Sequence, residues 1–203
     1  ESVEGKMPEI GWMPITVPGQ VSVWVALHDR FGSVEFASLF EPAIRYASEG
    51  FHVSRQTANR WQAGHSRYGH LQSWCDTFLI DGNPPEVGQL IQLPEHAATL
   101  QEIAHTNGES FYRGDLAKKM DTASRAEGGL LRAEDLASHT VEWVDPMSIN
   151  VGSATLHELP PNGQGIAALI ALKILQATET DLSDCDDPRM VHKIGRASCR
   201  ERV

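Results

Sequence analysis

The apolar residues of this chain change their spacing near His139, and this change constrains the fold more than any other feature of the sequence. Before His139, apolar residues recur every three or four positions, which is typical of amphipathic helices. From Val141 to Val151 they alternate with polar residues, which is typical of strands. A series of helices followed by strands predicts an α+β organisation rather than alternating βαβ units.

Prolines and glycines set the expected boundaries in the helical part. Pro42 interrupts the apolar stripe at 36–47, so we expect a short helix and then a second one that has Pro42 in its first turn and ends at Gly50. Gly32 is expected to end an earlier helix in the left-handed conformation. Further helices are predicted from Ser54 to about Trp61, from Pro94 to Asn107, from Asp115 to Gly128 and over Glu134–Ala137, with irregular chain from Gly64 to Pro85.

The sequence after His139 predicts a β-hairpin at about 141–159, with a tight turn at Gly152 and Ser153. The segment 166–175 is apolar nearly all round, which predicts a helix buried on most sides. Its longest uninterrupted apolar run has seven residues, far fewer than a membrane span needs. We therefore expect no membrane-spanning segment.

Composition excludes several classes of protein. Apolar residues make up 41% of the chain and charged residues 22%, unlike a disordered protein. The net charge of −10 disfavours a nucleic-acid partner, since a polyanion would be repelled. Three cysteines without a CxxC spacing provide neither a disulfide framework nor a zinc site.

Both ends of the sequence suggest a piece of a larger protein. The chain starts at Glu1, without an initiator Met or a signal region, and the sequence does not distinguish a cytoplasmic from a periplasmic location. Residues 194–203 read like the translation of a sequencing adapter, so we expect the natural domain to cover 1–193.

Common catalytic patterns are absent from the sequence. No two histidines have the i, i+4 spacing of a helical metal site, and His157-Glu158 lacks the second histidine of HExxH, because Pro161 stands there. No Gly-x-Ser-x-Gly elbow occurs. We therefore expect no metal, no cofactor and no catalytic residue within the chain.

The segment Asn162, Gly163, Gln164 and Gly165 is the candidate substrate-binding loop. With the following residues it fits GxGxxA, a dinucleotide-binding pattern, but the preceding strand belongs to a hairpin and no second apolar strand follows at 177–187. Backbone amides at the start of a helix can attract anions and carboxylates. The alternative is that the glycines only permit a tight turn from strand to helix.

Several segments, in order, resemble the large subunit of the gamma-glutamyltransferase family. Each segment is weakly specific, but together they extend over 12–193. The segments are Val17-Pro18-Gly19-Gln20-Val21-Ser22-Val23-Trp24, Arg30-Phe31-Gly32, Pro42-Ala43-Ile44, Gly50-Phe51-His52-Val53-Ser54, Phe111-Tyr112-Arg113-Gly114, Gly128-Gly129-Leu130-Leu131 and Leu159-Pro160-Pro161-Asn162-Gly163-Gln164-Gly165.

The resemblance implies part of an N-terminal-nucleophile hydrolase with a four-layer αββα core. Such a proenzyme cuts itself before a threonine, whose hydroxyl attacks a γ-glutamyl amide such as glutathione while its own α-amine acts as the base. The implied partners are the protein's own small subunit, a γ-glutamyl donor, and an amino acceptor or water. Without the small subunit we expect exposed apolar surface at Trp143, at Leu156 and along 166–175.

The departures from the family limit what the chain can do alone. The nucleophilic threonine belongs downstream of Lys193, and the arginine that binds the substrate carboxylate belongs upstream of Glu1, so we expect the isolated chain to be inactive. Asn162–Gly165 replaces the serine-rich loop of other members, which leaves open an acylase or small-amide amidohydrolase. A noncatalytic binding domain on the same scaffold is the other alternative.

Overall fold

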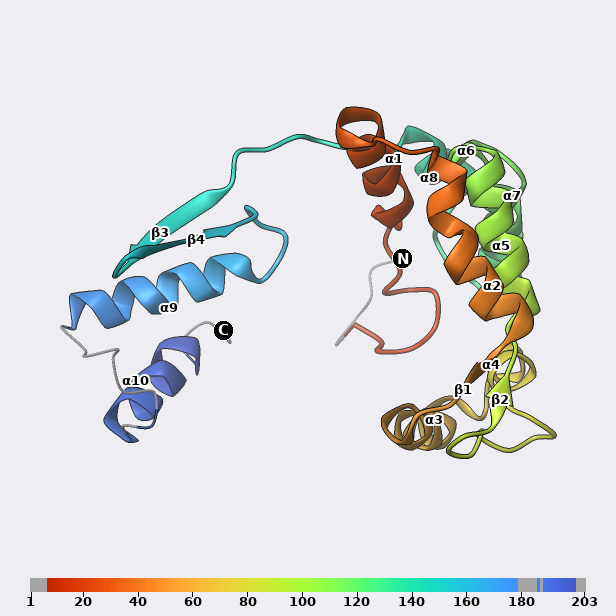
Figure 1. The fold of residues 1–203 in the computed structure, drawn as a ribbon, viewed down its shortest axis with the longest axis horizontal. Coiled ribbons are helices and arrows are strands. Elements are labelled where there is room, and N and C mark those ends of the chain that lie inside the picture. Colours follow the sequence, from red (N-terminus) through yellow and green to blue (C-terminus); the bar gives the residue numbers. More distant parts are fainter. Residues whose placement is uncertain (1–6, 179–185, 187, 200–203) are drawn as a thin grey trace. The chain divides into compact units, whose positions relative to one another are not determined.

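The structure is a computed structural model that describes residues 7–178, 186 and 188–199, except the side chains of 194 and 196–199. It divides into two compact units, Glu1–Val141 and Glu142–Val203, and each is described by itself. Figure 1 shows the helices of the first unit and the hairpin with two helices of the second.

The first unit is almost entirely helical and has one apolar core. Leu136 is fully buried at its centre, and Val21, Ile103, Tyr112 and Leu116 pack with it. Helices α2 and α5 lie side by side (Figure 1). The elements are α1 (Gln20–Phe31), the 3₁₀ helix η1 (Phe36–Phe40), α2 (Glu41–Glu49), β1 (Phe51–His52), α3 (Arg55–Tyr68), α4 (Gln72–Phe78), β2 (Leu90–Ile91), α5 (Pro94–His105), α6 (Glu109–Arg113), α7 (Asp115–Ala126) and α8 (Ala133–Ser138).

The predicted division at Pro42 is confirmed. The 3₁₀ helix η1 ends at Phe40, and Pro42 lies in the first turn of α2, where a missing N–H costs no helical hydrogen bond. Gly50 ends α2 with φ +94°, a conformation that side chains disfavour. The helices predicted from Pro94, from Asp115 and at 134–137 are also present as α5, α7 and α8.

The expected left-handed conformation at Gly32 is wrong. Gly32 does end α1, but its φ is −64° and its backbone is extended. Its N–H donates to the carbonyl oxygen of His28 at 2.7 Å. A Cβ on Gly32 would lie 2.5 Å from that same oxygen, so a close approach, rather than a positive φ, requires the glycine.

The predicted irregular chain from Gly64 is also wrong in its first part. Ser54 caps α3 as expected, accepting from the N–H of Thr57 at 3.3 Å, but α3 continues to Tyr68 and α4 follows. Rings hold these helices together: Trp61 and Trp74 both contact Phe78, with centroids 6.1 and 5.5 Å away. Such a cluster leaves no regular apolar stripe in the sequence.

The second unit contains the hairpin of β3 (Met147–Val151) and β4 (Ala154–Glu158), followed by α9 (Gly165–Ala177) and α10 (Pro188–Cys199). The strands pair antiparallel from Met147 opposite Glu158 to Val151 opposite Ala154, and Gly152 in the turn has φ +59°. The hairpin is shorter than the predicted 141–159, because Pro146 and Pro160 flank it and cannot donate to the ladder.

Helix α9 packs on the hairpin through one side only. Leu169 and Leu175 are buried, whereas Ile170 and Ile174 are 39% and 37% exposed. The expectation of a helix buried on most sides is therefore wrong within this unit. Gln176 anchors the other end of α9, because its side-chain amide donates to the carbonyl oxygen of Asn150.

Two further expectations concern the exposed surface and the last residues. Trp143 is 52% exposed, as expected, whereas Leu156 is half-buried. Helix α10 continues across 193–194, and the prediction that 194–203 derive from an adapter remains a prediction. Residues 200–203 lie outside the described part, as does most of 177–187, where no second strand was expected.

Candidate functional site

The predicted substrate loop connects the hairpin to α9. It leaves β4 after Glu158 and enters α9 at Gly165, as the ribbon in Figure 1 shows. Asn162, Gly163 and Gln164 are all exposed. Within the described part of the chain, neither Asn162 nor Gln164 has a side-chain hydrogen bond, so both amide groups are available to a ligand. That this loop binds substrate remains a prediction.

Gly165 lies against the side chain of Glu158. A Cβ added to Gly165 would be 2.9 Å from both Cβ and Cδ of Glu158, closer than carbon atoms normally approach. A larger residue at 165 would therefore displace the Glu158 side chain from the start of α9. By contrast, a Cβ on Gly163 would meet nothing within 4 Å among the described atoms, so that position has room.

The N-terminal turn of α9 has a distinctive charge environment. Gln164 adopts a helical conformation at the N-cap, and its carbonyl oxygen accepts from the N–H of Ala167 at 3.0 Å. As far as the structure describes it, this turn has neither a side-chain cap nor an acidic residue of its own. The partial positive charge of a helix N-terminus favours a nearby carboxylate, and Glu158 provides one.

The sequence places Glu158 in an incomplete HExxH pattern and on one face of the second predicted strand, but it predicts no role for this residue. Its contact with Gly165 could have been suspected from spacing, since it shares the half-buried side of β4 with Leu156. A charged residue in an otherwise apolar alternation requires a polar partner.

The first unit contains a serine–histidine pair that sequence reasoning missed. His139 Nε2 lies 2.9 Å from Ser22 Oγ, and the Ser22 hydroxyl donates to the carbonyl oxygen of Gly19 at 2.7 Å. Because a hydroxyl has one proton, His139 must be the donor to Ser22. In this arrangement the Ser22 proton points to Gly19 rather than to His139, unlike the proton of a nucleophile paired with its base. No sequence signal links residues 117 positions apart.

Tyr112 completes this arrangement. Its hydroxyl donates to the carbonyl oxygen of Pro18 at 2.7 Å and accepts from the N–H of Ser22 at 3.0 Å. Its ring stacks on His139 with centroids 5.2 Å apart. These contacts attach the start of α1 to α6 and to the residue after α8, so the cluster has a structural role.

An apolar hollow of about 490 Å³ also lies in the first unit. Trp24, Leu27, Phe31 and Leu39 contribute to its lining, and His28 is the one titratable residue among the lining residues. The His28 ring is occupied, with Nε2 2.7 Å from the carbonyl oxygen of Val34. This hollow can accept an apolar group but provides no acid–base pair.

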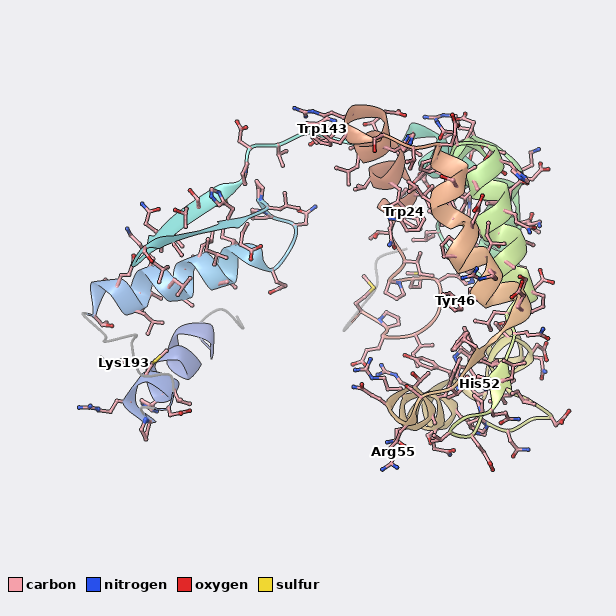
Figure 2. All side chains as sticks on the ribbon, in the orientation of Figure 1. Trp24, Tyr46, His52, Arg55, Trp143 and Lys193 are labelled. Atoms are coloured by element: carbon pink, nitrogen blue, oxygen red, sulfur yellow. The ribbon has the colours of Figure 1, made fainter. Side chains whose placement is uncertain are left out.

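The described residues contain no group of three histidine, cysteine or acidic side chains suited to a metal ion. Nor does any helix in the described ranges have the length and apolar character to cross a bilayer. Figure 2 shows the side chains on both units, with Trp24 and Trp143 labelled.

Known proteins resemble this chain in both sequence and structure. The profile of the family described as Gamma-glutamyltranspeptidase matches residues 1–199. The glutathione hydrolase-like YwrD proenzyme of Bacillus subtilis is 32% identical over 80% of this chain and 31% of that protein. The oxamate amidohydrolase proenzyme of Klebsiella pneumoniae is 31% identical over 92% of this chain and 36% of that protein.

Among solved structures, the cephalosporin acylase from Bacillus halodurans superimposes with a TM-score of 0.89 and is 39% identical. The match covers 96% of this chain and 37% of that protein. The chain thus spans about a third of the length of the curated relatives it matches, in their N-terminal, large-subunit region.

Proposed function

The chain belongs to the gamma-glutamyltranspeptidase family, and from this membership we propose that it is the large-subunit part of a proenzyme acting on γ-glutamyl amides such as glutathione. The observation that carries the proposal is the family match, which extends over nearly the whole chain rather than over one motif. In this proposal residues 1–193 are the natural part of the large subunit.

The proposed chemistry is acyl transfer through a nucleophile outside the chain. Proteins of the family are heterodimers processed autocatalytically. In the proposal, processing frees an N-terminal threonine on the small subunit. Its hydroxyl oxygen attacks the γ-carbonyl carbon, and its α-amine takes the hydroxyl proton and passes it to the departing amine. Water or an amino acceptor then attacks the acyl carbon and displaces the threonine oxygen, which takes up the proton that the attacking group loses.

The proposed contribution of this chain is the scaffold and one substrate contact. The loop at Asn162, Gly163, Gln164 and Gly165 would touch the donor. This is supported by two side-chain amides that have no hydrogen bond to the described residues, and by the open space at Gly163 among the described atoms. The hairpin and α9 would provide one sheet edge and one helical layer of an αββα core.

A related amide hydrolase is the second candidate. The similarity to an oxamate amidohydrolase and to a cephalosporin acylase favours it. The side chains of Asn162 and Gln164 are equally compatible with an amide hydrolase, because neutral amides can bind polar groups of many substrates. The two candidates share the reaction and differ in the acyl group that is recognised.

The test uses the protein encoded by the complete gene. We expect the purified proenzyme to split into two chains and then to hydrolyse a γ-glutamyl anilide, faster with an amino acceptor. Oxamate and a cephalosporin are assayed in parallel, and preference for either one would replace the first candidate with the second. A protein that neither splits nor hydrolyses any of the three would favour the noncatalytic binding domain. The isolated 203-residue chain is the negative control.

A further inference from the structure

Glu158 occupies an unusual position for an acidic residue. In β4 the exposed residues Thr155 and His157 alternate with Leu156 and Glu158, which are half-buried. The side of the strand that carries Leu156 therefore also carries a carboxylate. A charge that is partly removed from water is stabilised only by a polar or oppositely charged neighbour.

The neighbour is the beginning of α9. The Glu158 side chain contacts Gly165, the first residue of that helix. The helix carries a partial positive charge at this end, and the turn, as described, lacks an acidic residue of its own. Strand β4 thus provides an acidic group at the helix end where a negative charge is favourable.

This contact closes the base of the candidate substrate loop. The loop lies in the connection between Glu158 and Gly165, so the six residues 159–164 are held at both ends by one side-chain contact. Pro160 and Pro161 restrict the first half of the loop. Asn162 and Gln164 have no side-chain hydrogen bond to the described residues, so their orientation depends on the backbone that this contact holds.

We propose that Glu158 is a positioning residue for the proposed reaction: its carboxylate, set against the N-terminus of α9, holds the loop 162–165 in the conformation that receives the donor. The inference rests on the proposed function for its effect on catalysis. Its effect on the loop itself does not depend on any activity. Glu158 acts through Gly165 and the loop and does not touch the reacting atoms.

The test uses the full-length, processed protein in four forms: wild type, Glu158→Ala, Glu158→Gln and the control His157→Ala. His157 is the adjacent residue and is on the exposed side of β4. Amide hydrogen exchange is followed in peptides covering 159–168, and KM and kcat are measured for a γ-glutamyl anilide. The midpoint of thermal unfolding and the extent of processing report general structural damage.

We expect Glu158→Ala to raise exchange in 159–168 alone and to raise KM about three- to tenfold, with kcat changed less than about twofold, as loss of a charge at a helix end predicts. Glu158→Gln keeps the shape without the charge and should lie between wild type and Glu158→Ala. His157→Ala should behave as wild type.

Unchanged exchange and unchanged KM in Glu158→Ala would overturn the inference. So would faster exchange throughout the protein with a lower unfolding midpoint, because Glu158 would then only support the fold. If exchange in 159–168 rises but the wild type hydrolyses no γ-glutamyl substrate, the proposed function fails and the positioning of the loop by Glu158 stands.

Discussion

His139 Nε2 donates a hydrogen bond to Ser22 Oγ across 2.9 Å, although the two residues are 117 positions apart in the chain. The Ser22 hydroxyl donates a hydrogen bond to the carbonyl oxygen of Gly19, and the His139 ring stacks on Tyr112. The bond therefore joins the two ends of the first unit. A serine and a histidine are the residue types of a nucleophile and its base. Here, however, the Ser22 hydroxyl donates to Gly19 and not to His139, so the hydrogen bond has a structural role.

We expect His139→Ala to lower the free energy of unfolding by about 1–2 kcal/mol, the sum of one hydrogen bond and one ring contact. Chemical denaturation measures this loss. His70→Ala is the control: His70 is exposed, and we expect a change within about 0.5 kcal/mol. Equal effects of the two substitutions would contradict the structural role of His139.

Gly32→Ala should destabilise the first unit by more than about 2 kcal/mol, because the new Cβ would overlap a backbone carbonyl that cannot rotate away. Gly163→Ala serves as the control for stability, since a Cβ there is unobstructed in the described structure. The comparison requires only thermal unfolding of the two variants. A tolerated alanine at 32 would mean that the end of α1 shifts easily.

Asp115 and Lys118 form an exposed ion pair at the start of α7, with Lys118 Nζ 2.8 Å from Asp115 Oδ1. The hydrogen bond and the charge of Lys118 lower the pKa of Asp115 below its ordinary 3.8, and Asp115 raises the pKa of Lys118 above 10.5. The stabilisation from Asp115 is thus present above pH 3.8 and is lost as the pH falls through its lowered pKa.

On the basic side, the stabilisation from Lys118 is present below pH 10.5 and is lost as the pH rises through its raised pKa. We expect Lys118→Gln, or high salt, to return the pKa of Asp115 toward 3.8, because screening weakens an exposed pair. Titration of the Asp115 carboxyl carbon by NMR measures this change. An unchanged titration curve in Lys118→Gln would show that the ion pair is not formed in solution.

Adjacent residues of α9 should respond very differently to truncation. Leu169→Ala removes a buried side chain and should cost about 2–4 kcal/mol. Ile170→Ala trims a side chain that is 39% exposed and should cost less than about 1 kcal/mol in the isolated chain. Denaturation followed by circular dichroism distinguishes the two, and similar losses would mean that Ile170 is covered, for example by self-association.

Regular spacing made some elements predictable and its absence hid others. The boundaries of α2 follow from Pro42 and Gly50, because each residue restricts the backbone locally. The continuation of α3 beyond Trp61 could not be predicted in this way. It depends on ring contacts with Phe78, which comes from a different helix.

The candidate site also combines features that the sequence predicts with features that it does not. Turn residues and a following apolar segment were enough to predict the loop 162–165. The contact between Gly165 and Glu158 was harder to predict, because six residues separate the two in the sequence. The bond between Ser22 and His139 could not be predicted, since nothing local in either segment depends on the other.

The bonds from the start of α1 to Tyr112 and His139 also affect the order of events during synthesis. A ribosome must release nearly the whole first unit before these bonds can close, so the N-terminal helix waits for residues made much later. The hairpin needs only neighbouring residues, from Met147 to Glu158, and can pair soon after it emerges. Nascent α1 would meanwhile display Val21 and Trp24, which the folded unit covers, to water, and this makes it a target for chaperones.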